Sequence, residues 1–518
     1  MEETQHTFTE ISQEIADNFL STIVFIDECA YKQAPENDND FDAKAVTDTF
    51  AKKGKICSVF APEKVSDLDN ICSMLFKADA IVLDWRLNIT DDKSLPSTDL
   101  ETDSDSDDER GQYTIPIIQK IVEDAENGKV KLIVVYTGET DLNNIYQNLF
   151  DQIQSVNKQQ LRDLEVRINN VKILVRAKYK KGKYSHLGDA LKQFMVKYEE
   201  LPDFIVNEFS SLTAGLLPNF ALQAITEIRN STSKILGVFS KDLDPAFLGH
   251  CSLTCIDDGA EVLSEVFGTA ITELIDASSI DLNEFVNRWL NGIPSTGKEI
   301  DLIDTKTKHI VVTQDLLKQV ISGCFENIKD KSNNTYSKEN ARKHSTGFYC
   351  LNGESEDESN LLFAQLSQNQ NLFSTKPITP ELTQGTILKD DQNCYWLCVS
   401  PACDCARVGV EGRNFLFVPL VKSEEKKSSP IIINENNILY PNMHPFDMKV
   451  FFFTNEHIAP YYTCQNKYCF LSGQHIFEWV LTLKRLYAQR ITEKLSSQLS
   501  RVGLNVSEWL RAKGNDKD

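Results

Sequence analysis

Apolar runs in the first third of the sequence end, one after another, in residues that could do chemistry. The run Ala80–Leu83 leads directly into Asp84. An apolar run without alternation is typical of a parallel strand that is covered on both faces. Ligands of open α/β sheets bind outside the carboxyl ends of such strands. The same position, after or at the end of an apolar run, is held by Asp27, Glu28, Thr137 and Lys178.

Carboxylates from separate strand ends would form a binding site for a divalent cation if they meet. Mg²⁺ prefers hard oxygen ligands in octahedral geometry and keeps several waters, so a few carboxylates suffice. Asp84 is the centre of this hypothesis, because four apolar residues run directly into this single carboxylate. The alternative is that Asp27, Glu28 and Asp84 only terminate strands, as acidic residues at sheet edges commonly do.

The elements that must position these residues alternate between strands and helices. Each expected strand is short and apolar, and each is followed by a segment with helical spacing or by a polar insert. This alternation predicts a doubly wound parallel α/β sheet. The expected strands are 22–26, 56–60, 80–83, 131–136 and 171–177, and the expected helices are 6–20, 42–52, 67–76, 115–126 and 141–150.

With these residues in register, the first third resembles the receiver domain of two-component response regulators. The resemblance implies that Asp84 accepts a phosphoryl group from a histidine kinase in the presence of magnesium. It implies the remaining roles as well: Asp27 and Glu28 as the acidic pair, Arg86 as a backbone carbonyl ligand of the metal, Thr137 as the switch hydroxyl and Lys178 as the phosphoryl-contacting lysine.

Physical chemistry agrees with these implied roles. A carboxylate attacks phosphorus only if the negative charge on both partners is offset, which a metal ion and a lysine do. A hydroxyl on a neighbouring strand can turn toward the new phosphoryl oxygens and so couple the chemistry to a surface change.

The sequence also departs from the receiver pattern. Tyr179 follows Lys178 where the family usually has proline, and lysines crowd 178–183, so that Lys180 is an alternative to Lys178. Inserts at 33–41, at 88–112 and before the fifth strand lengthen the spacing between the site residues. The second insert follows Asp84 directly, and it would block a kinase if it lay over the site.

Beyond the receiver-like part (1–198) we expect three further domains. Helical spacing predicts an all-helical domain over 199–345, with apolar stripes that form a core or a protein-partner face. Short apolar runs separated by turn residues predict a β-rich barrel or sandwich over 346–473. The tail, 474–518, begins with an amphipathic helix over 474–500, which we expect to dock on the barrel.

A second candidate site lies in the β-rich part, where Cys403 and Asp404 share a turn that begins Ser400-Pro401. A cysteine nucleophile here is a weaker hypothesis, because a neighbouring carboxylate makes a thiol less acidic. Structural zinc is not expected, because the spacing of Cys394, Cys398, Cys403 and Cys405 lacks the paired C-x2-C pattern.

Composition narrows the class of protein. A formal net charge of −22 argues against nucleic acid as the main partner, because phosphate binding needs a concentrated basic surface. No run approaches the roughly 18 apolar residues of a membrane span, and the start, Met1-Glu2-Glu3, lacks the features of an export signal. Thirteen scattered cysteines fit reduced thiols, so we expect a cytoplasmic protein.

We therefore expect a cytoplasmic multidomain regulator in which phosphorylation of Asp84 controls the C-terminal modules or a partner. The partner would be a histidine kinase or a kinase-like ATPase subunit, and protein contacts would use the helical domain. One alternative is an inert receiver that serves as an assembly subunit, for instance in a bacterial defence system. A weaker alternative is an effector enzyme that uses the Cys403 region.

Overall fold

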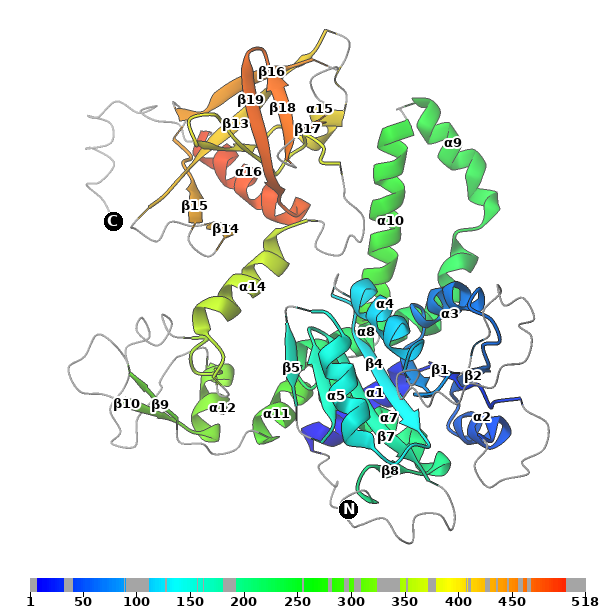
Figure 1. Cartoon of the computed structure of the whole chain (residues 1–518). Coiled ribbons are helices and arrows are strands. Elements are labelled where there is room, and N and C mark those ends of the chain that lie inside the picture. Colours follow the sequence, from blue (N-terminus) through cyan, green and yellow to red (C-terminus); the bar gives the residue numbers. More distant parts are fainter. Residues whose placement is uncertain are drawn as a thin grey trace, which may run out of the picture. The chain divides into compact units, whose positions relative to one another are not determined.

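The computed structural model forms two compact units (Figure 1). Unit 1 comprises Met1–Ser240 and Gly268–Ile293, and unit 2 comprises Lys241–Phe267 and Pro294–Asp518. The structure describes residues 7–31, 41–87, 89, 111–125, 128–155, 157–161, 163–179, 192–253, 256–277, 282–292, 298–301, 309–323, 345–350, 353–370, 379–406, 408, 411–423, 429–434, 437–444, 447–454, 460–463 and 467–499.

Unit 1 is built on a parallel sheet whose strand order is β2-β1-β3-β4-β7. All five predicted strands are present and parallel, so the prediction of a doubly wound sheet is confirmed for this part of the chain. The strands are β1 (Thr22–Ile26), β2 (Ile56–Phe60), β3 (Ala80–Leu83), β4 (Lys131–Thr137) and β7 (Val171–Lys178).

Three short strands extend the sheet beyond β7, and the sequence analysis did not predict them. An antiparallel pair, β6 (Glu165–Ile168) and β5 (Lys158–Gln160), continues the sheet from the first half of β7. The third, β8 (Met195–Val196), pairs in parallel with Ala177 and Lys178 at the other end of β7. These strands are two to four residues long and partly polar, so their hydrophobic pattern is too weak to detect.

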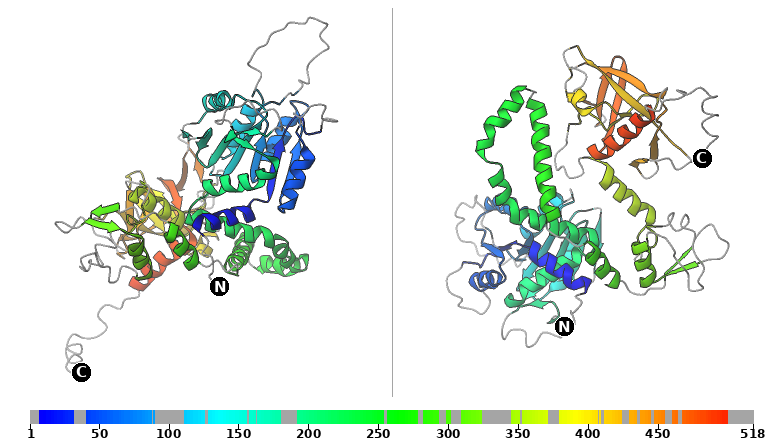
Figure 2. Two further views of the ribbon diagram at one scale, coloured as in Figure 1. Left: turned by 90° about the horizontal axis from the view of Figure 1, so that it is seen from below. Right: turned by 180° about the vertical axis from the view of Figure 1, so that it is seen from behind.

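Helices cover both faces of the sheet (Figure 2). One core lies between the sheet and α3, α4 and α5, and the other lies between the sheet and α1, α2 and α7. Alternate residues of β1, β3, β4 and β7 enter opposite cores, as the period of a β-strand requires. The helices are α1 (Phe8–Phe19), α2 (Ala43–Lys52), α3 (Asp67–Leu75), α4 (Thr114–Ala125), α5 (Leu142–Gln152) and α7 (Leu201–Leu212).

The middle of the chain is helical, but not wholly so. Its helices are α7, α8 (Leu216–Val238), α9 (Asp244–Leu253), α10 (Ile256–Ala277), α11 (Leu282–Gly292) and α12 (Gln314–Gly323). Strands β9 (Lys298–Asp301) and β10 (His309–Val312) form an antiparallel pair before α12. The expectation of an all-helical middle was therefore wrong at 298–301 and 309–312, where two strands of four residues each are present.

Three of these helices share a core with the sheet of unit 1. Residues Leu201, Phe209, Leu222 and Phe285, from α7, α8 and α11, pack in the cluster that contains strand residues of β1, β3 and β4. The division at 198/199 therefore separates segments that pack together. The four-part division into 1–198, 199–345, 346–473 and 474–518 stays a prediction.

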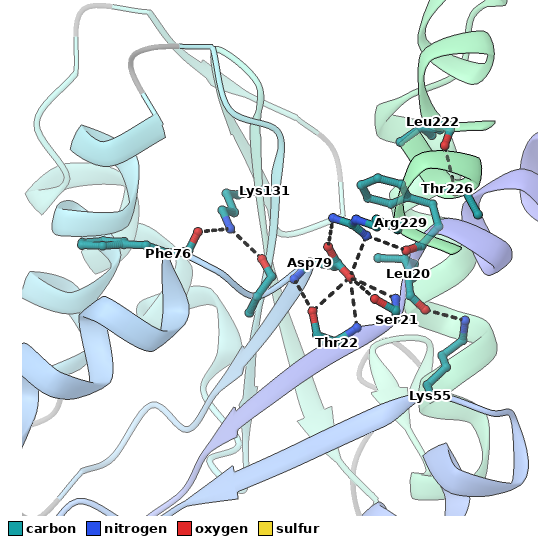
Figure 3. Close-up of polar contacts among 12 residues, drawn as sticks. Leu20, Ser21, Thr22, Lys55, Phe76, Asp79, Lys131, Leu222, Thr226 and Arg229 are labelled. Atoms are coloured by element: carbon teal, nitrogen blue, oxygen red, sulfur yellow. Dashed lines mark hydrogen bonds and ion pairs between the residues drawn. The ribbon is translucent and has the colours of Figure 1, made fainter. Parts of the chain in front are cut away.

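A buried carboxylate fastens α8 to the amino edge of the sheet (Figure 3). Asp79 precedes β3, and its Oδ2 accepts hydrogen bonds from the backbone and hydroxyl groups of Ser21 and Thr22, each at 3.0 Å. Arg229 of α8 donates to Asp79 Oδ1 at 2.9 Å. The guanidinium also donates to the carbonyl of Phe19 at 3.1 Å and lies over its ring. One salt bridge thus joins α1, β1, β3 and α8.

Unit 2 contains a second, antiparallel sheet with strand order β14-β15-β13-β12-β11-β19-β18-β17, and β16 pairs with β13. The predicted β-rich part is confirmed in this coarse form. The strands are β11 (Thr386–Lys389), β12 (Tyr395–Cys398), β13 (Arg413–Val421), β14 (Ile431–Asn434), β15 (Asn437–Pro441), β16 (Lys449–Phe453), β17 (Tyr461–Tyr462), β18 (Tyr468–Ser472) and β19 (His475–Thr482). Two short helices, α14 (Glu356–Gln368) and α15 (Ala402–Ala406), lie in the same unit.

The prediction of one helix over 474–500 was wrong in its first third. Residues 475–482 form β19, which pairs with β11 and β18, and the helix α16 spans only Arg485–Leu499. The apolar spacing of this segment fits both the helical period and the strand period, but Ile476 is 51% exposed whereas Phe477 is buried. A strand therefore buries Phe477 and exposes Ile476, whereas the predicted helix would have buried Ile476.

The docking of the terminal helix on the sheet agrees with the expectation. Ala488, Ile491 and Leu495 of α16 are buried in one cluster with Ile387 of β11 and Leu397 of β12. Among the described residues, no helix is both long and apolar enough to cross a membrane.

Candidate functional site

A single ammonium group joins two carboxylates at the carboxyl edge of the unit 1 sheet. Lys178 Nζ lies 2.5 Å from Asp27 Oδ2 and 2.7 Å from Asp84 Oδ2. The three side chains come from the ends of β7, β1 and β3, and all are between 3% and 12% exposed. The two carboxylates therefore face each other across a position that one cation occupies.

Parallel register brings these residues together. The backbone N–H of Asp84 donates to the carbonyl of Ile26, and that of Asp27 donates to the carbonyl of Phe60. These bonds continue the hydrogen-bond pattern between β3, β1 and β2 by one residue. Both aspartates therefore lie directly after the last paired residues of their strands, at the same edge of the sheet. Asp27 is held further by the backbone N–H of Cys29, which donates to its Oδ1 at 2.8 Å.

The charges at this edge do not balance. Two carboxylates share one ammonium group, which leaves one excess negative charge in a buried place. Burial raises the pKa of Asp84 to about 6, against the opposing effect of Lys178 and with a further upward effect of Asp27. Burial works against the charged form of Lys178, but Asp84 and Asp27 outweigh it and raise the pKa of the ammonium group. The site thus holds its lysine charged and favours an additional positive charge.

Aromatic rings line the lysine side of the site. The ammonium of Lys178 lies 5.4 Å from the ring centre of Phe41 and 5.9 Å from that of Tyr136. Tyr136 donates a hydrogen bond to the carbonyl of Val196 in β8 and contacts the ring of Tyr198. These rings restrict the lysine to the side of the carboxylates. The sequence analysis did not assign either ring to the site: Phe41 lies far from the strand ends in sequence, and Tyr136 was read only as part of its strand.

The turn after β3 is held by the first residue of α4. Thr114 is fully buried, and its hydroxyl donates to the carbonyls of Asp84 and Trp85 at 2.9 and 3.1 Å. The ring of Trp85 packs against Gly111, whose Cα is so close that an added Cβ would lie 2.4 Å from it. Thr114 was not predicted as a site residue, and its position at the start of the expected helix was the only signal for it.

The other predicted site residues lie at or near the same edge. Thr137 is buried at the end of β4, beside Ala177 of β7, and its hydroxyl accepts a hydrogen bond from the backbone N–H of Glu139. Glu28 is half-buried next to Asp27, and Arg86 is exposed two residues after Asp84. The alternative lysine, Lys180, lies outside the described residues, as does most of the insert at 88–112.

The donor set of this site suits magnesium. Asp27 and Asp84 already face one cation position, and Mg²⁺ needs one or two carboxylates when phosphoryl oxygen and waters supply its remaining ligands. In the part of the chain that the structure describes, no group of three or more His, Cys, Asp or Glu side chains is assembled as a closed metal site. An open site of two carboxylates is consistent with both observations.

The candidate second site in unit 2 has a different arrangement. Cys403 is exposed on the short helix α15, and Asp404 forms an ion pair with Arg413 at 2.7 Å. The hydroxyl of Ser400 accepts a hydrogen bond from the backbone N–H of Leu416. Asp404 is thus engaged in holding the turn to β13, and no described contact joins Cys403 to a histidine.

Comparison with known proteins agrees with the geometry at the sheet edge. No curated protein and no solved structure matches the chain. Residues 19–183 match the family model described as the response receiver domain. This range includes all five parallel strands and every residue of the candidate site at their ends. The first third of the chain is a receiver domain.

Proposed function

We propose that this protein is a regulator that is switched by Mg²⁺-dependent phosphorylation of Asp84. The observation that carries the proposal is the ammonium of Lys178, which lies within hydrogen-bond distance of both Asp27 and Asp84. This arrangement supplies the nucleophilic carboxylate, a partner carboxylate and a cation for phosphoryl oxygens in one place. The match of residues 19–183 to the receiver family supports the same function.

In the proposed reaction an oxygen of Asp84 attacks the phosphorus of the donor, and the bond between phosphorus and the leaving group breaks. With a histidine kinase, this is the P–N bond of a phosphohistidine, and the imidazole leaves. A pKa of about 6 keeps most Asp84 carboxylates ionised at neutral pH, as a nucleophile requires. Burial is the largest cause of this raised pKa and the charge of Asp27 adds to it, so an approaching magnesium ion would favour the ionised carboxylate.

Each neighbour has a role in this proposal. Asp27 and Glu28 would hold Mg²⁺ together with Asp84 and the backbone carbonyl of Arg86. Lys178 would move from bridging the carboxylates to contacting a phosphoryl oxygen. Thr137 would turn its hydroxyl toward another. When bound, magnesium neutralises charge on the phosphoryl oxygens and on the carboxylates.

The signal would pass to the helices that share the core of unit 1. Phosphorylation changes the partners of Lys178, the last residue of β7, and β7 is tied to α7 by buried ion pairs. Lys172 of β7 contacts Glu208 of α7 at 2.5 Å, and Arg176 pairs with Glu165 beside them. A histidine kinase or a kinase-like ATPase subunit would be the phosphodonor, and protein partners would bind the helical part.

The test is labelling of the full-length protein with acetyl phosphate and MgCl₂, followed by intact-mass measurement and peptide mapping. We expect a mass increase of one phosphoryl group that is stable in acid and labile in base. The label should map to Asp84 and should be absent without Mg²⁺ and in Asp84→Asn. The matched control is Asp69→Asn, which removes an exposed carboxylate of α3 that pairs with Lys120.

Two outcomes would contradict the proposal. Labelling of Asp84→Asn at the rate of the wild-type protein would place the phosphoryl group elsewhere. Absence of label with acetyl phosphate and with a phosphorylated histidine kinase, in a protein whose Asp84→Asn variant is equally folded, would favour the inert receiver that acts as an assembly subunit.

A further inference from the structure

Helix α9 and the part of helix α10 that belongs to unit 2 expose an unusual amount of apolar surface. Helices α9 and α10 follow one another as a hairpin, in green in Figure 1. Seven large apolar side chains in the segment 241–267 are between 40% and 88% exposed: Leu243, Leu248, Leu253, Val262, Leu263, Val266 and Phe267. We call these seven residues the hairpin patch. Patches of this kind on a soluble protein mark sites of protein contact.

A close contact between the two helices involves residues outside the hairpin patch. Gly259 of α10 lies against Cys251 and Phe247 of α9, so closely that an added Cβ would be 2.5 Å from the sulfur of Cys251. The helices therefore approach each other through a glycine and two α9 side chains. The seven residues of the hairpin patch are not among the side chains of this contact and are exposed.

Four residues of the patch form a continuous stripe on α10. Val262 and Val266 are four residues apart, as are Leu263 and Phe267, so the four side chains make two adjacent rows along one side of the helix. Each of the four is between 40% and 51% exposed. Two rows at this spacing form the surface that receives the apolar face of another helix.

The negative charge of the hairpin favours a positively charged partner helix. Between 242 and 267 the chain has no lysine or arginine, and it has six acidic residues: Asp242, Asp244, Asp257, Asp258, Glu261 and Glu265. A second copy of the hairpin would place like charges opposite each other, which disfavours association. A helix with apolar residues on one side and lysine or arginine at its margins would complement both the stripe and the charge.

One contact within unit 2 already has this chemistry. Glu265 of α10 lies 3.4 Å from Arg485, which begins the amphipathic helix α16. The carboxylate is therefore placed where a cationic side chain of a neighbouring helix can reach it.

We propose that the α9–α10 hairpin is the docking site for a basic amphipathic helix of a protein partner. The partner helix would lay its apolar side on the stripe of α10 and its lysines or arginines beside the acidic residues. This inference is independent of the phosphorylation proposed for Asp84.

The test measures binding of a synthetic peptide to the full-length protein by fluorescence anisotropy. The probe is a labelled helix of about 18 residues, or five turns, with leucine at helical spacing and lysine at the other positions. A second peptide carries glutamate in place of lysine. We expect the lysine peptide to bind at least about tenfold more tightly than the glutamate peptide, and its affinity to fall as salt is raised.

Variants locate the binding. We expect Val262→Gln combined with Val266→Gln to weaken binding of the lysine peptide by about tenfold, and Glu265→Gln to reduce the dependence on salt. The matched control is Leu362→Gln combined with Phe363→Gln, which changes two apolar residues of α14 that are 58% and 59% exposed. This control should bind as the wild-type protein does.

Three results would overturn the proposal. One is equal binding by the Val262→Gln/Val266→Gln variant and the wild-type protein. Another is an equal loss in the Leu362→Gln/Phe363→Gln control, which would indicate general attraction to an acidic protein. The third is a wild-type dimer in sedimentation that the Val262→Gln/Val266→Gln variant converts to monomers, which would identify a second copy as the occupant.

Discussion

The guanidinium of Arg229 lies 2.9 Å from the buried carboxylate of Asp79, and 150 residues of chain separate them. Burial alone would raise the pKa of Asp79, but hydrogen bonds from Arg229 and from the amides of Ser21 and Thr22 outweigh burial and hold the pKa below its usual range. A carboxylate with a lowered pKa stabilises the folded state above its unfolded-state pKa, and this stabilisation is lost as pH falls through the folded-state value. The pair thus fastens α8 to the receiver sheet at neutral pH.

Arg229→Gln should therefore lower the free energy of unfolding of unit 1 at pH 7 by about 1–2 kcal/mol, because it leaves Asp79 buried with fewer partners. The estimate is below that for a fully buried pair, because the arginine side chain is 42% exposed. The matched control is Lys234→Gln on the same helix, which is exposed and should change stability by less than about 0.5 kcal/mol. Urea denaturation of both variants at pH 7 gives the comparison. If Arg229→Gln and Lys234→Gln unfold at the same urea midpoint, the ion pair between Arg229 and Asp79 does not stabilise unit 1.

Lys178→Gln should make the stability of unit 1 depend on magnesium. Without its cation, the site leaves Asp27 and Asp84 facing each other, which we expect to cost about 3 kcal/mol. We expect Mg²⁺ to bind the folded form of this variant and to restore part of the loss, whereas the wild-type protein already has an ammonium between the carboxylates. Thermal denaturation with MgCl₂ and with NaCl of equal ionic strength measures the difference.

The control for this experiment is another buried lysine of the same strand. Lys172 also contacts two carboxylates, Glu165 and Glu208, but at the opposite end of β7 and beside Arg176. Lys172→Gln should destabilise unit 1 without a specific gain from Mg²⁺. An equal gain in both variants would mean that magnesium acts on buried acids in general and not on the pair at Asp84.

The parallel sheet could be predicted from the sequence because its signals are local. Each of the five strands is a short segment dominated by apolar residues, and parallel topology then brings the ends of β1, β3 and β7 to one edge. The approach of Asp27, Asp84 and Lys178 follows from that topology alone. Their roles in phosphoryl transfer stay predictions.

The remaining features depend on contacts between distant segments. Nothing in the residues around Asp79 indicates that Arg229 will pair with it, and nothing near Asp84 indicates that Thr114, beyond a long insert, will hold its carbonyl. The mistaken helix over 474–500 has a different cause. The apolar residues of 475–482 fit both a helix and a strand, and pairing with β11 and β18 decides between them.

The rate of phosphorylation by acetyl phosphate should fall as pH drops below the pKa of Asp84, which burial raises to about 6. Only the ionised carboxylate attacks phosphorus, so the initial rate at pH 5 should be about one tenth of the rate at pH 7. The donor's own pH dependence is measured in parallel with an unrelated nucleophile. A rate that stays constant between pH 7 and pH 5 would mean that Asp84 keeps an ordinary pKa.

The same raised pKa predicts how stability changes with pH. A carboxylate whose folded-state pKa exceeds its unfolded-state value stabilises the protein at low pH, and this contribution is lost as pH rises through the folded-state pKa. The neutral side chain of Asp84→Asn does not ionise, so this variant does not lose that contribution as pH rises. The free energy of unfolding of Asp84→Asn minus that of the wild-type protein should therefore increase between pH 4 and pH 7, by up to about 3 kcal/mol. Urea midpoints of both proteins across this range provide the measurement. A decreasing difference would show that Asp84 is stabilised in its charged form.

Gly111→Ala should disturb the proposed phosphorylation site at Asp84 through Trp85. Gly111 has a φ of +89°, and an added Cβ would lie 2.4 Å from the buried indole ring. Trp85 directly follows Asp84, and its carbonyl accepts from Thr114, so displacement of the ring should move the carboxylate as well. We expect a loss of about 3 kcal/mol of stability and a labelling rate of Asp84 reduced by at least about tenfold.

Gly128→Ala separates backbone strain from this steric effect. Gly128 has nearly the same φ, +91°, but no atom lies within 4 Å of the position of an added Cβ. The substitution should therefore cost only about 1 kcal/mol and leave the labelling of Asp84 unchanged. If Gly111→Ala and Gly128→Ala lose the same stability and label equally well, the packing of Trp85 against Gly111 does not position Asp84. If only Gly111→Ala labels slowly, the buried ring and the start of α4 are part of what holds the nucleophile in place.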